Sequence, residues 1–222
     1  MTIAAELVPF WLSAGLWLCC LITLGLCARY ADWAALQRDT RLYHLLFGGV
    51  IFCMVLWLLS VRMIEGLWLH FLGVTTLTLI LGWRFAMLAG SVAIVLHTLL
   101  LGEALAAVSP AWLFTVAIPA SVSRAVVHFL RKLKSRNLFI YMLGAGFGGG
   151  VLSVLFVALV AVPLLWMIGQ TQWAAAALVN WPLITLMVFP EGFINGMLVT
   201  TLTVFYPGLV KTFDDRYYLG DE

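Results

Sequence analysis

The stretch LFIYMLGAGFGGGVLSVLFVALVAVPLLWMI, residues 138–168, contains no charged side chain and decides the fold class. A helix needs about 20 consecutive apolar residues to cross the hydrocarbon core of a bilayer. The rest of the chain has the same character, because 64% of its 222 residues are hydrophobic and only 10% are charged. Soluble domains carry roughly 25% charged residues. The sequence therefore predicts an all-α integral membrane protein embedded in a lipid bilayer.

Apolar runs of the required length predict seven transmembrane helices in a single polytopic domain over residues 1–222. The helices are expected at about 7–28, 43–61, 66–82, 85–106, 111–130, 138–168 and 178–206. The third run is short and the last two are long, so tilted or interrupted helices are expected. The opening MTIAAELVPFW lacks a basic region and a cleavage site, and is expected to belong to the mature protein.

The basic residues gather in the loops on one side of this predicted bundle. Arg62 is on the opposite side, and Arg124 lies near the basic end of the fifth helix. The other ten of the twelve Lys and Arg residues follow the first, third, fifth and seventh helices: Arg29, Arg38, Arg41, Arg84, Arg131, Lys132, Lys134, Arg136, Lys211 and Arg216. Because basic loops stay in the cytoplasm, the N-terminus is predicted outside and the C-terminus inside a cell (inner) membrane. A net charge of only +2 argues against a nucleic-acid partner.

The glycine run LGAGFGGG, residues 143–150, resembles a phosphate-binding loop only superficially, because no Lys-Ser/Thr pair follows it. Gly144 and Gly148 are four residues apart, as are Gly146 and Gly150. This spacing of small residues lets helices pack closely in lipid. We interpret the run as a helix-packing surface.

Several ionisable side chains lie within or beside the apolar segments. His70 and His97 are both expected in the outer half of the membrane, where they could line one outward-facing cavity with Glu65 and Glu103 at its mouth and Glu191 farther down. Intramembrane ionisable groups often mark ion or substrate paths. Imidazole and carboxylate ligands suit divalent first-row metals. Each histidine could equally form a structural hydrogen bond to a neighbouring helix.

Glu191 stands in VFPEGFINGML, residues 188–198, inside an otherwise apolar helix. Burial of an unpaired carboxylate costs several kcal/mol or more. Asn195 lies one turn later on the same helix face, and Gly192 and Gly196 leave room for a close neighbour. Glu191 and Asn195 therefore belong either to a substrate path or to a structural hydrogen-bonded pair.

The role of the four cysteines also has two possible interpretations. They all lie in apolar segments without CxxC spacing: Cys19, Cys20, Cys27 and Cys53. They are either small residues packed within helices or ligands of a soft-metal thiolate site.

Two blocks of the sequence resemble the CbiM/NikM family, the substrate-binding membrane subunits of energy-coupling-factor transporters for cobalt and nickel. They are LWLHFLGVTTLTLILGWRFAMLAGSVAIVLHTLLLGE (67–103) and FPEGFINGMLVTTLTVF (189–205). The resemblance implies a seven-helix subunit that captures a divalent transition metal ion as its substrate. A small transmembrane coupling subunit and two cytoplasmic ATPases would complete the transporter.

The family's metal ligands are only partly matched in this chain. The resemblance implies that metal is held by the N-terminal amine, here that of Met1, by a histidine at position two, and by a later histidine, matched by His70. Thr2 occupies position two, so the imidazole of the N-terminal chelate is missing. His97 and Glu103 are the side chains expected to substitute as ligands.

Two other functions are compatible with the residues. A membrane scaffold or assembly partner would use the buried polar groups only to fix helix packing. An intramembrane metalloenzyme would place a metal among His70, His97 and Glu191, but the chain has no HExxH motif and no nucleophile elbow. A non-enzymatic capture subunit is therefore the preferred prediction. The chain also has no Walker motif, so a separate module would have to hydrolyse ATP.

Overall fold

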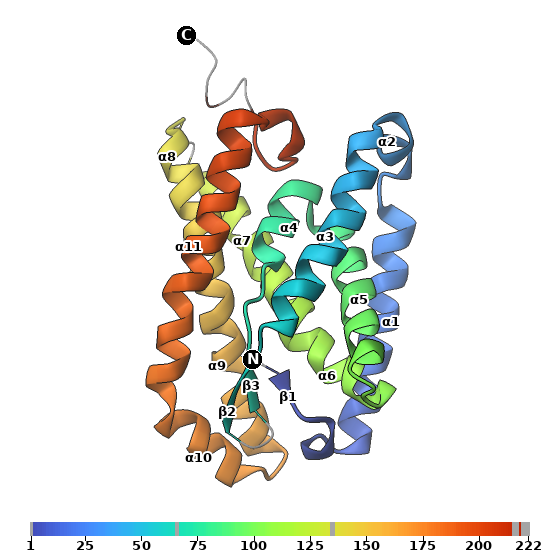
Figure 1. The fold of residues 1–222 in the computed structure, drawn as a ribbon, viewed down its shortest axis with the longest axis vertical. Helices are drawn as coiled ribbons and strands as arrows, with labels where there is room; N and C mark the ends of the chain where they lie inside the picture. The colour runs from blue at the N-terminus through green and yellow to red at the C-terminus, as the bar shows by residue number, and fades with distance from the viewer. Residues whose placement is uncertain (1, 65–66, 134–135, 215–217, 219–222) are drawn as a thin grey trace.

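The computed structural model describes residues 2–64, 67–133, 136–214 and 218 of the chain. Six helices in this part are long and apolar enough to cross a membrane, and they stand side by side in a bundle (Figure 1). They are α1 (Phe10–Tyr30), α3 (Thr40–Leu58), α5 (Trp83–Leu100), α11 (Trp181–Phe205) and two composite helices over Leu105–Lys132 and Leu138–Met167. The all-α, multi-pass membrane character predicted from composition is confirmed. The count of seven helices is not.

Each composite helix contains a π-helical segment. The first consists of η2 (Leu105–Ala107), α6 (Val108–Trp112), π-helical η3 (Leu113–Ala117) and α7 (Ile118–Lys132). The second consists of α8 (Leu138–Tyr141), π-helical η4 (Met142–Gly148) and α9 (Gly149–Met167). Short helices connect the long ones: η1 (Ala5–Leu7), α2 (Trp33–Arg38), α10 (Thr171–Val179) and η5 (Pro207–Leu209).

The third predicted helix, 66–82, is wrong. Strand β3 (Leu67–Leu69) pairs with β2 (Val61–Ile64), and among the described residues of this range only α4 (Val74–Leu81) is helical. Gly73 before α4 and Gly82 after it have positive φ angles of 67° and 79°, which end the helix at both sides. Hydrophobicity alone could not separate this segment from a continuous helix.

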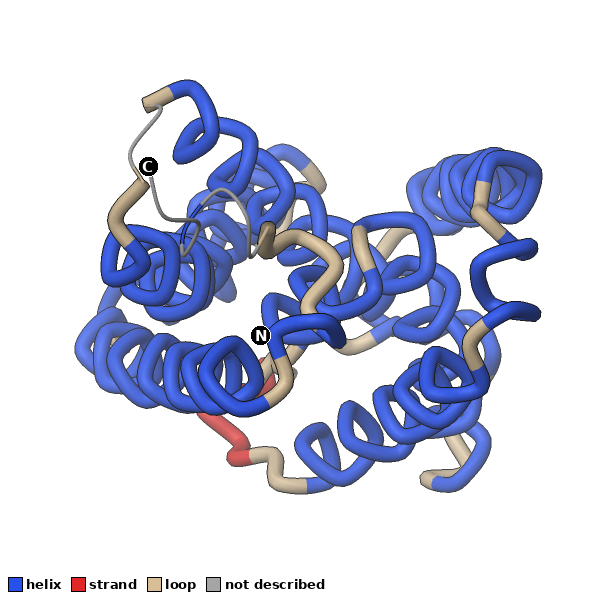
Figure 2. The backbone as a smooth tube through the Cα atoms, turned by 90° about the horizontal axis from the view of Figure 1, so that it is seen from above, coloured by secondary structure: helices blue, strands red, loops and turns tan. Residues whose placement is uncertain are grey.

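The broken segment lies in the middle of the bundle. All eight residues of α4 are buried, and α4 contacts α3, α5, α7 and α11. Irregular backbone at membrane depth is tolerated only inside the protein or beside a water-filled cavity, because lipid offers no hydrogen bonds. The helices accordingly surround this segment and the N-terminal end of the chain, as both views show (Figures 1 and 2).

A small antiparallel sheet draws the N-terminal residues into the bundle. Strand β1 (Thr2–Ile3) pairs with β3, so that Thr2 lies opposite Trp68 and Ile3 opposite Leu67. The strand order is β1-β3-β2. The sheet thus places the start of the chain close to the residue that follows β3, which is His70.

The glycine run packs helix against helix as predicted. A Cβ atom at Gly146 would lie 3.1 Å from the Cα of Gly196, and one at Gly150 would lie 3.0 Å from the Cα of Gly192. The four glycines therefore bring η4 and α9 into backbone contact with α11. This close approach fixes the position of Glu191, the neighbour of Gly192, within the bundle.

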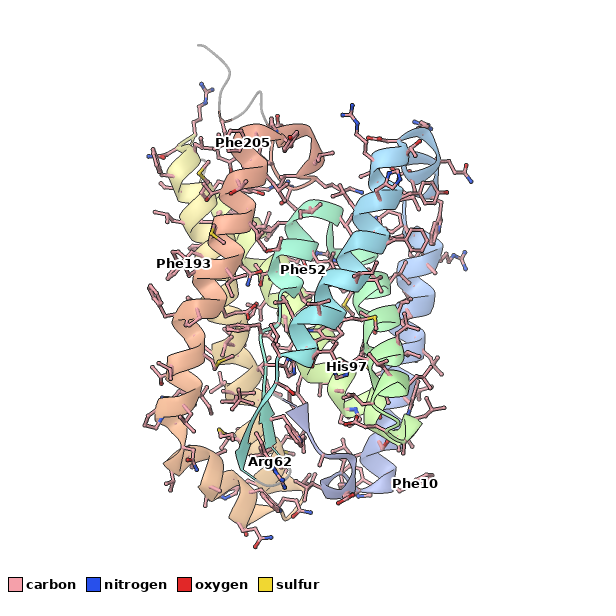
Figure 3. All side chains as sticks on the ribbon, viewed as in Figure 1. Phe10, Phe52, Arg62, His97, Phe193 and Phe205 are labelled. Atoms are coloured by element: carbon pink, nitrogen blue, oxygen red, sulfur yellow. The ribbon has the colours of Figure 1, made fainter. Side chains whose placement is uncertain are left out.

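The ends of the bundle differ in charge. The described members of the basic group all lie at the same end of the bundle as the C-terminal end of α11 (Figure 1). They are carried by the ends of α1, α2 and α7, the beginnings of α3 and α5, and the segments before α8 and after α11. Arg62 lies at the opposite end, while apolar side chains such as Phe10 and Phe193 project from the outside of the bundle (Figure 3). The orientation of these ends across the membrane stays a prediction.

Candidate metal site

A cavity of about 390 Å³ lies between the small sheet and α5. It is lined by His70, His97 and Glu103, three of the residues expected from the sequence. The remaining lining comes from β1 and its continuation, from α3 and the turn after it, and from residues around α5 and α6: Ile3, Ala4, Glu6, Trp57, Ser60, Trp68, Ile94, Thr98, Leu101, Ala104 and Ala111. Segments far apart in the sequence therefore build one cavity. In Figure 1 the strands β1 and β3 and the helix α6 lie in the half of the bundle away from the C-terminal end of α11.

His70 enters this cavity from the loop between β3 and α4. Its side chain is 6% exposed, and its Nδ1 lies 3.0 Å from the carbonyl oxygen of Phe71. A carbonyl can only accept, so Nδ1 of the neutral imidazole is the donor in this contact. The lone pair is then on Nε2. A hydrogen bond of this kind is how proteins orient a metal-binding imidazole.

His97 reaches the cavity from α5. Its Nε2 atom is buried and has no hydrogen-bond partner among the described residues. Buried polar atoms in folded proteins are nearly always satisfied, so an unsatisfied one calls for an explanation such as an absent ion or water. A second element thus adds to the cavity wall an imidazole whose Nε2 no described residue engages.

The indole of Trp57 contacts both imidazoles. Its ring centroid lies 6.4 Å from that of His70 and 6.2 Å from that of His97, with edge-to-face geometry in both pairs. Its Nε1 donates to the carbonyl oxygen of Leu72 at 3.0 Å, which fixes the indole plane. Trp57 therefore limits how far each imidazole can turn.

Two carboxylates accompany the histidines at the edge of the cavity. Glu103 is exposed just beyond α5, and Glu6 is exposed in η1. The sequence pattern placed Glu103 at the mouth of a cavity but gave Glu6 no role. Met1 and Glu65, the other two residues proposed for this region, lie outside the described residues.

Glu191 does not line the cavity and has a different set of contacts. Its Oε2 accepts the backbone N–H of Leu72 at 2.7 Å, and its Oε1 accepts that of Gly73 at 2.9 Å. Oε1 also accepts the side-chain amide of Asn195 at 2.7 Å. Both oxygens of this buried carboxylate are therefore occupied by donors.

Asn195 extends the same network to the first turn of α4. Its Oδ1 accepts the backbone N–H of Thr76 at 2.9 Å and the Thr76 hydroxyl at 2.7 Å. The first N–H groups of a helix have no partner within the helix. Glu191 and Asn195 satisfy these groups from across the bundle and attach the loop that carries His70 to α11.

The described part of the chain contains no preformed metal site built from side chains alone. No three His, Cys, Asp or Glu side chains in it lie close enough together to hold an ion. The four cysteines are free, and Cys20, Cys27 and Cys53 are buried in the apolar core. Two imidazoles in one cavity could therefore complete a coordination sphere only with other groups, such as backbone atoms, water or residues that move.

Comparison with known proteins agrees with this architecture. The family model for the cobalt uptake substrate-specific transmembrane region, CbiM, matches residues 2–209. The chain belongs to the CbiM family. Two crystal structures share its fold: one of a transition metal transporter (TM-score 0.75, 18% identity, 92% of this chain and 93% of that chain) and one of a truncated transition metal transporter (0.73, 19%, 92% and 99%). Among curated protein sequences, none matches this chain significantly.

Membership of the CbiM family confirms the resemblance inferred from the two sequence blocks. The family model covers all the residues that line the cavity, including those of β1, the loop at His70 and α5. Sequence reasoning missed Trp57, although this tryptophan stands shortly before the segment that carries His70. The sheet carried no sequence signal strong enough to outweigh the apolar run around it.

Proposed function

We propose that this CbiM-family protein captures a divalent transition metal ion of the cobalt and nickel class in the cavity between His70 and His97. One observation carries the proposal: two imidazoles from different elements line the same cavity with a ring nitrogen that no described residue engages. Neutral imidazole nitrogen is a strong ligand for these ions. The family is one of membrane components for cobalt uptake, which fits this chemistry.

The carboxylates at the edge of the cavity support the same function. Glu6 and Glu103 place negative charge where an ion would enter. A cleft lined by one sign of charge raises the local concentration of ions of the opposite sign. We assign Glu103 and Glu6 to attraction of the cation, with Glu103 also available as a ligand.

The N-terminal strand supplies the remaining candidate ligands. Strand β1 holds Thr2 opposite Trp68, two residues before His70, so the adjacent backbone is near the imidazole. Thr2 has no imidazole with which to form a chelate. A contribution from the amine of Met1 stays a prediction, and backbone groups of the first residues fit the same position.

Energy for uptake would come from other subunits. The chain has no Walker motif, and the proposed function requires a small transmembrane coupling subunit and cytoplasmic ATPases. In this arrangement the protein is a capture subunit of the inner membrane rather than an enzyme. The basic end of the bundle would face the cytoplasm and the cavity would open on the other side.

The experiment is metal analysis of the purified protein after loading with Co²⁺ or Ni²⁺. We expect one ion per chain, and a loss of at least about tenfold in affinity for His70→Ala and for His97→Ala. His128→Ala is the matched control, because His128 lies on α7 toward the basic end. Absence of bound metal under any divalent loading would refute the proposal and favour a scaffold function.

A further inference from the structure

A second site lies at the basic end of the bundle, on the opposite side from the metal cavity. A pocket of about 240 Å³ is lined there by three cations, Arg84, Arg124 and Lys211. The structure gives none of the three an ion pair with any described residue, and all three are exposed. Asp32 lies in the same pocket, but its Oδ1 accepts the N–H of Ala35 as the cap of α2. The pocket therefore has an excess of positive charge.

Aromatic residues of this pocket hold two of its three cations in place. The Arg124 guanidinium lies 4.8 Å from the ring centroid of Trp83, and the Lys211 ammonium lies 5.6 Å from that of Phe85. The indole Nε1 of Trp83 is buried and has no partner in the described part of the chain. Three cations without an ion-pair partner among the described residues are the donor set that an anionic oxygen satisfies.

An apolar groove begins where the basic pocket ends. The groove has a volume of about 720 Å³, lies between α1, α3 and α5, and is lined almost entirely by apolar side chains. Phe85 lines both the pocket and the groove, and it packs edge-to-face on Trp33 with ring centroids 5.4 Å apart. From Phe85 to Leu96 the groove follows α5 for roughly 16 Å, at about 1.5 Å per residue.

The length of the groove and the charge of the pocket together favour one kind of occupant. Half of a hydrocarbon core of about 30 Å is about 15 Å, so the groove matches the depth of one leaflet. Its charged end lies at the helix termini, next to Trp33 and Trp83, where tryptophan marks the membrane interface. A phosphate group fits the three cations of the pocket, while an acyl chain fits the groove.

We propose that an anionic phospholipid binds here, with its phosphate in the pocket of Arg84, Arg124 and Lys211 and an acyl chain in the groove between α1, α3 and α5. Basic pockets between transmembrane helices hold anionic headgroups in this way. Helix α1 has few buried residues, so a lipid seated in the groove would also join α1 and α3 to α5. The site is independent of the metal cavity.

The test is native mass spectrometry of the delipidated full-length protein with dioleoylphosphatidylglycerol or dioleoylphosphatidylcholine. We expect preferential retention of phosphatidylglycerol. Arg124→Gln should lower its retention roughly fivefold, since one cation near the membrane surface contributes about that factor. Arg38→Gln is the matched control, because Arg38 ends α2 outside the pocket. Equal retention of the two lipids, or equal effects of the two arginine variants, would overturn the proposal.

A groove variant separates a lipid from a free phosphate ion. Val92 is exposed and lines the groove, so Val92→Trp fills it without entering the core. Lipid retention should fall in this variant, and inorganic phosphate at millimolar concentration should displace little phosphatidylglycerol from the unmodified protein. Unchanged retention in Val92→Trp, together with displacement by phosphate, would show a phosphate site only and contradict the lipid proposal.

Discussion

The carboxylate of Glu191 accepts the backbone N–H of Leu72 at 2.7 Å, which ties the last long helix to the loop that carries His70. The two residues are 119 positions apart in the chain. Glu191 therefore holds the loop of His70 in place, although it does not line the cavity.

Replacement of Glu191 by glutamine should weaken both the fold and metal capture. The substituted side chain would turn an NH₂ group toward donors, leaving at least one buried N–H unsatisfied at a cost of about 1–3 kcal/mol. We expect a lower melting temperature in detergent and a lower affinity for Co²⁺. The control is Thr185→Val, because the Thr185 hydroxyl on the same helix bonds only to its own turn. A Glu191→Gln protein with unchanged stability and affinity would contradict the anchoring role.

Substitution of Asn195 should lower the stability of the protein more than substitution of its partner Thr76. Asn195→Asp keeps the acceptor for Thr76, but it replaces the amide donor with an oxygen facing Glu191, where donor and acceptor are 2.7 Å apart. Thr76→Val removes one hydroxyl and leaves the backbone N–H bonded to Asn195. We expect Thr76→Val to reduce the free energy of unfolding by about 1 kcal/mol and Asn195→Asp to reduce it further. Thermal unfolding of both variants measures the difference, and an equal or reversed order would disprove the assigned geometry.

The glycine contact between α9 and α11 can be tested with a matched pair. A Cβ at Gly150 would lie 3.0 Å from the carbonyl oxygen of Glu191, whereas one at Gly25 in α1 would meet nothing within 4 Å. Overpacking a tight contact costs about 1–3 kcal/mol, so Gly150→Ala should destabilise the protein. Gly25→Ala should be neutral or stabilising by up to about 1 kcal/mol, because alanine favours helices. Similar melting temperatures for the two variants would mean that the close approach is not important for stability.

Composition and charge determined the class of this protein and most of its long helices. An apolar run indicates a favourable free energy of transfer into lipid. Its position can therefore be recognised without knowing which helices pack together. The spacing of the glycines predicted their packing role, because small residues four positions apart let helices approach closely in lipid. The ligand role of His70 and His97 stays a prediction. Family resemblance rested on the same apolar blocks, and the family model confirms it.

Only the tertiary structure decided the course of residues 59–64 and 67–82 and the contacts of Glu191. A buried strand and a buried half-helix are equally apolar, so hydrophobicity cannot distinguish them from one continuous helix. The backbone groups of that segment are satisfied by residues far away in sequence, Thr2 and Ile3 in the sheet and Glu191 and Asn195 at α4. Because lipid supplies no hydrogen bonds, these long-range partners are what allow the chain to break its helix at this depth and hold His70 at the cavity.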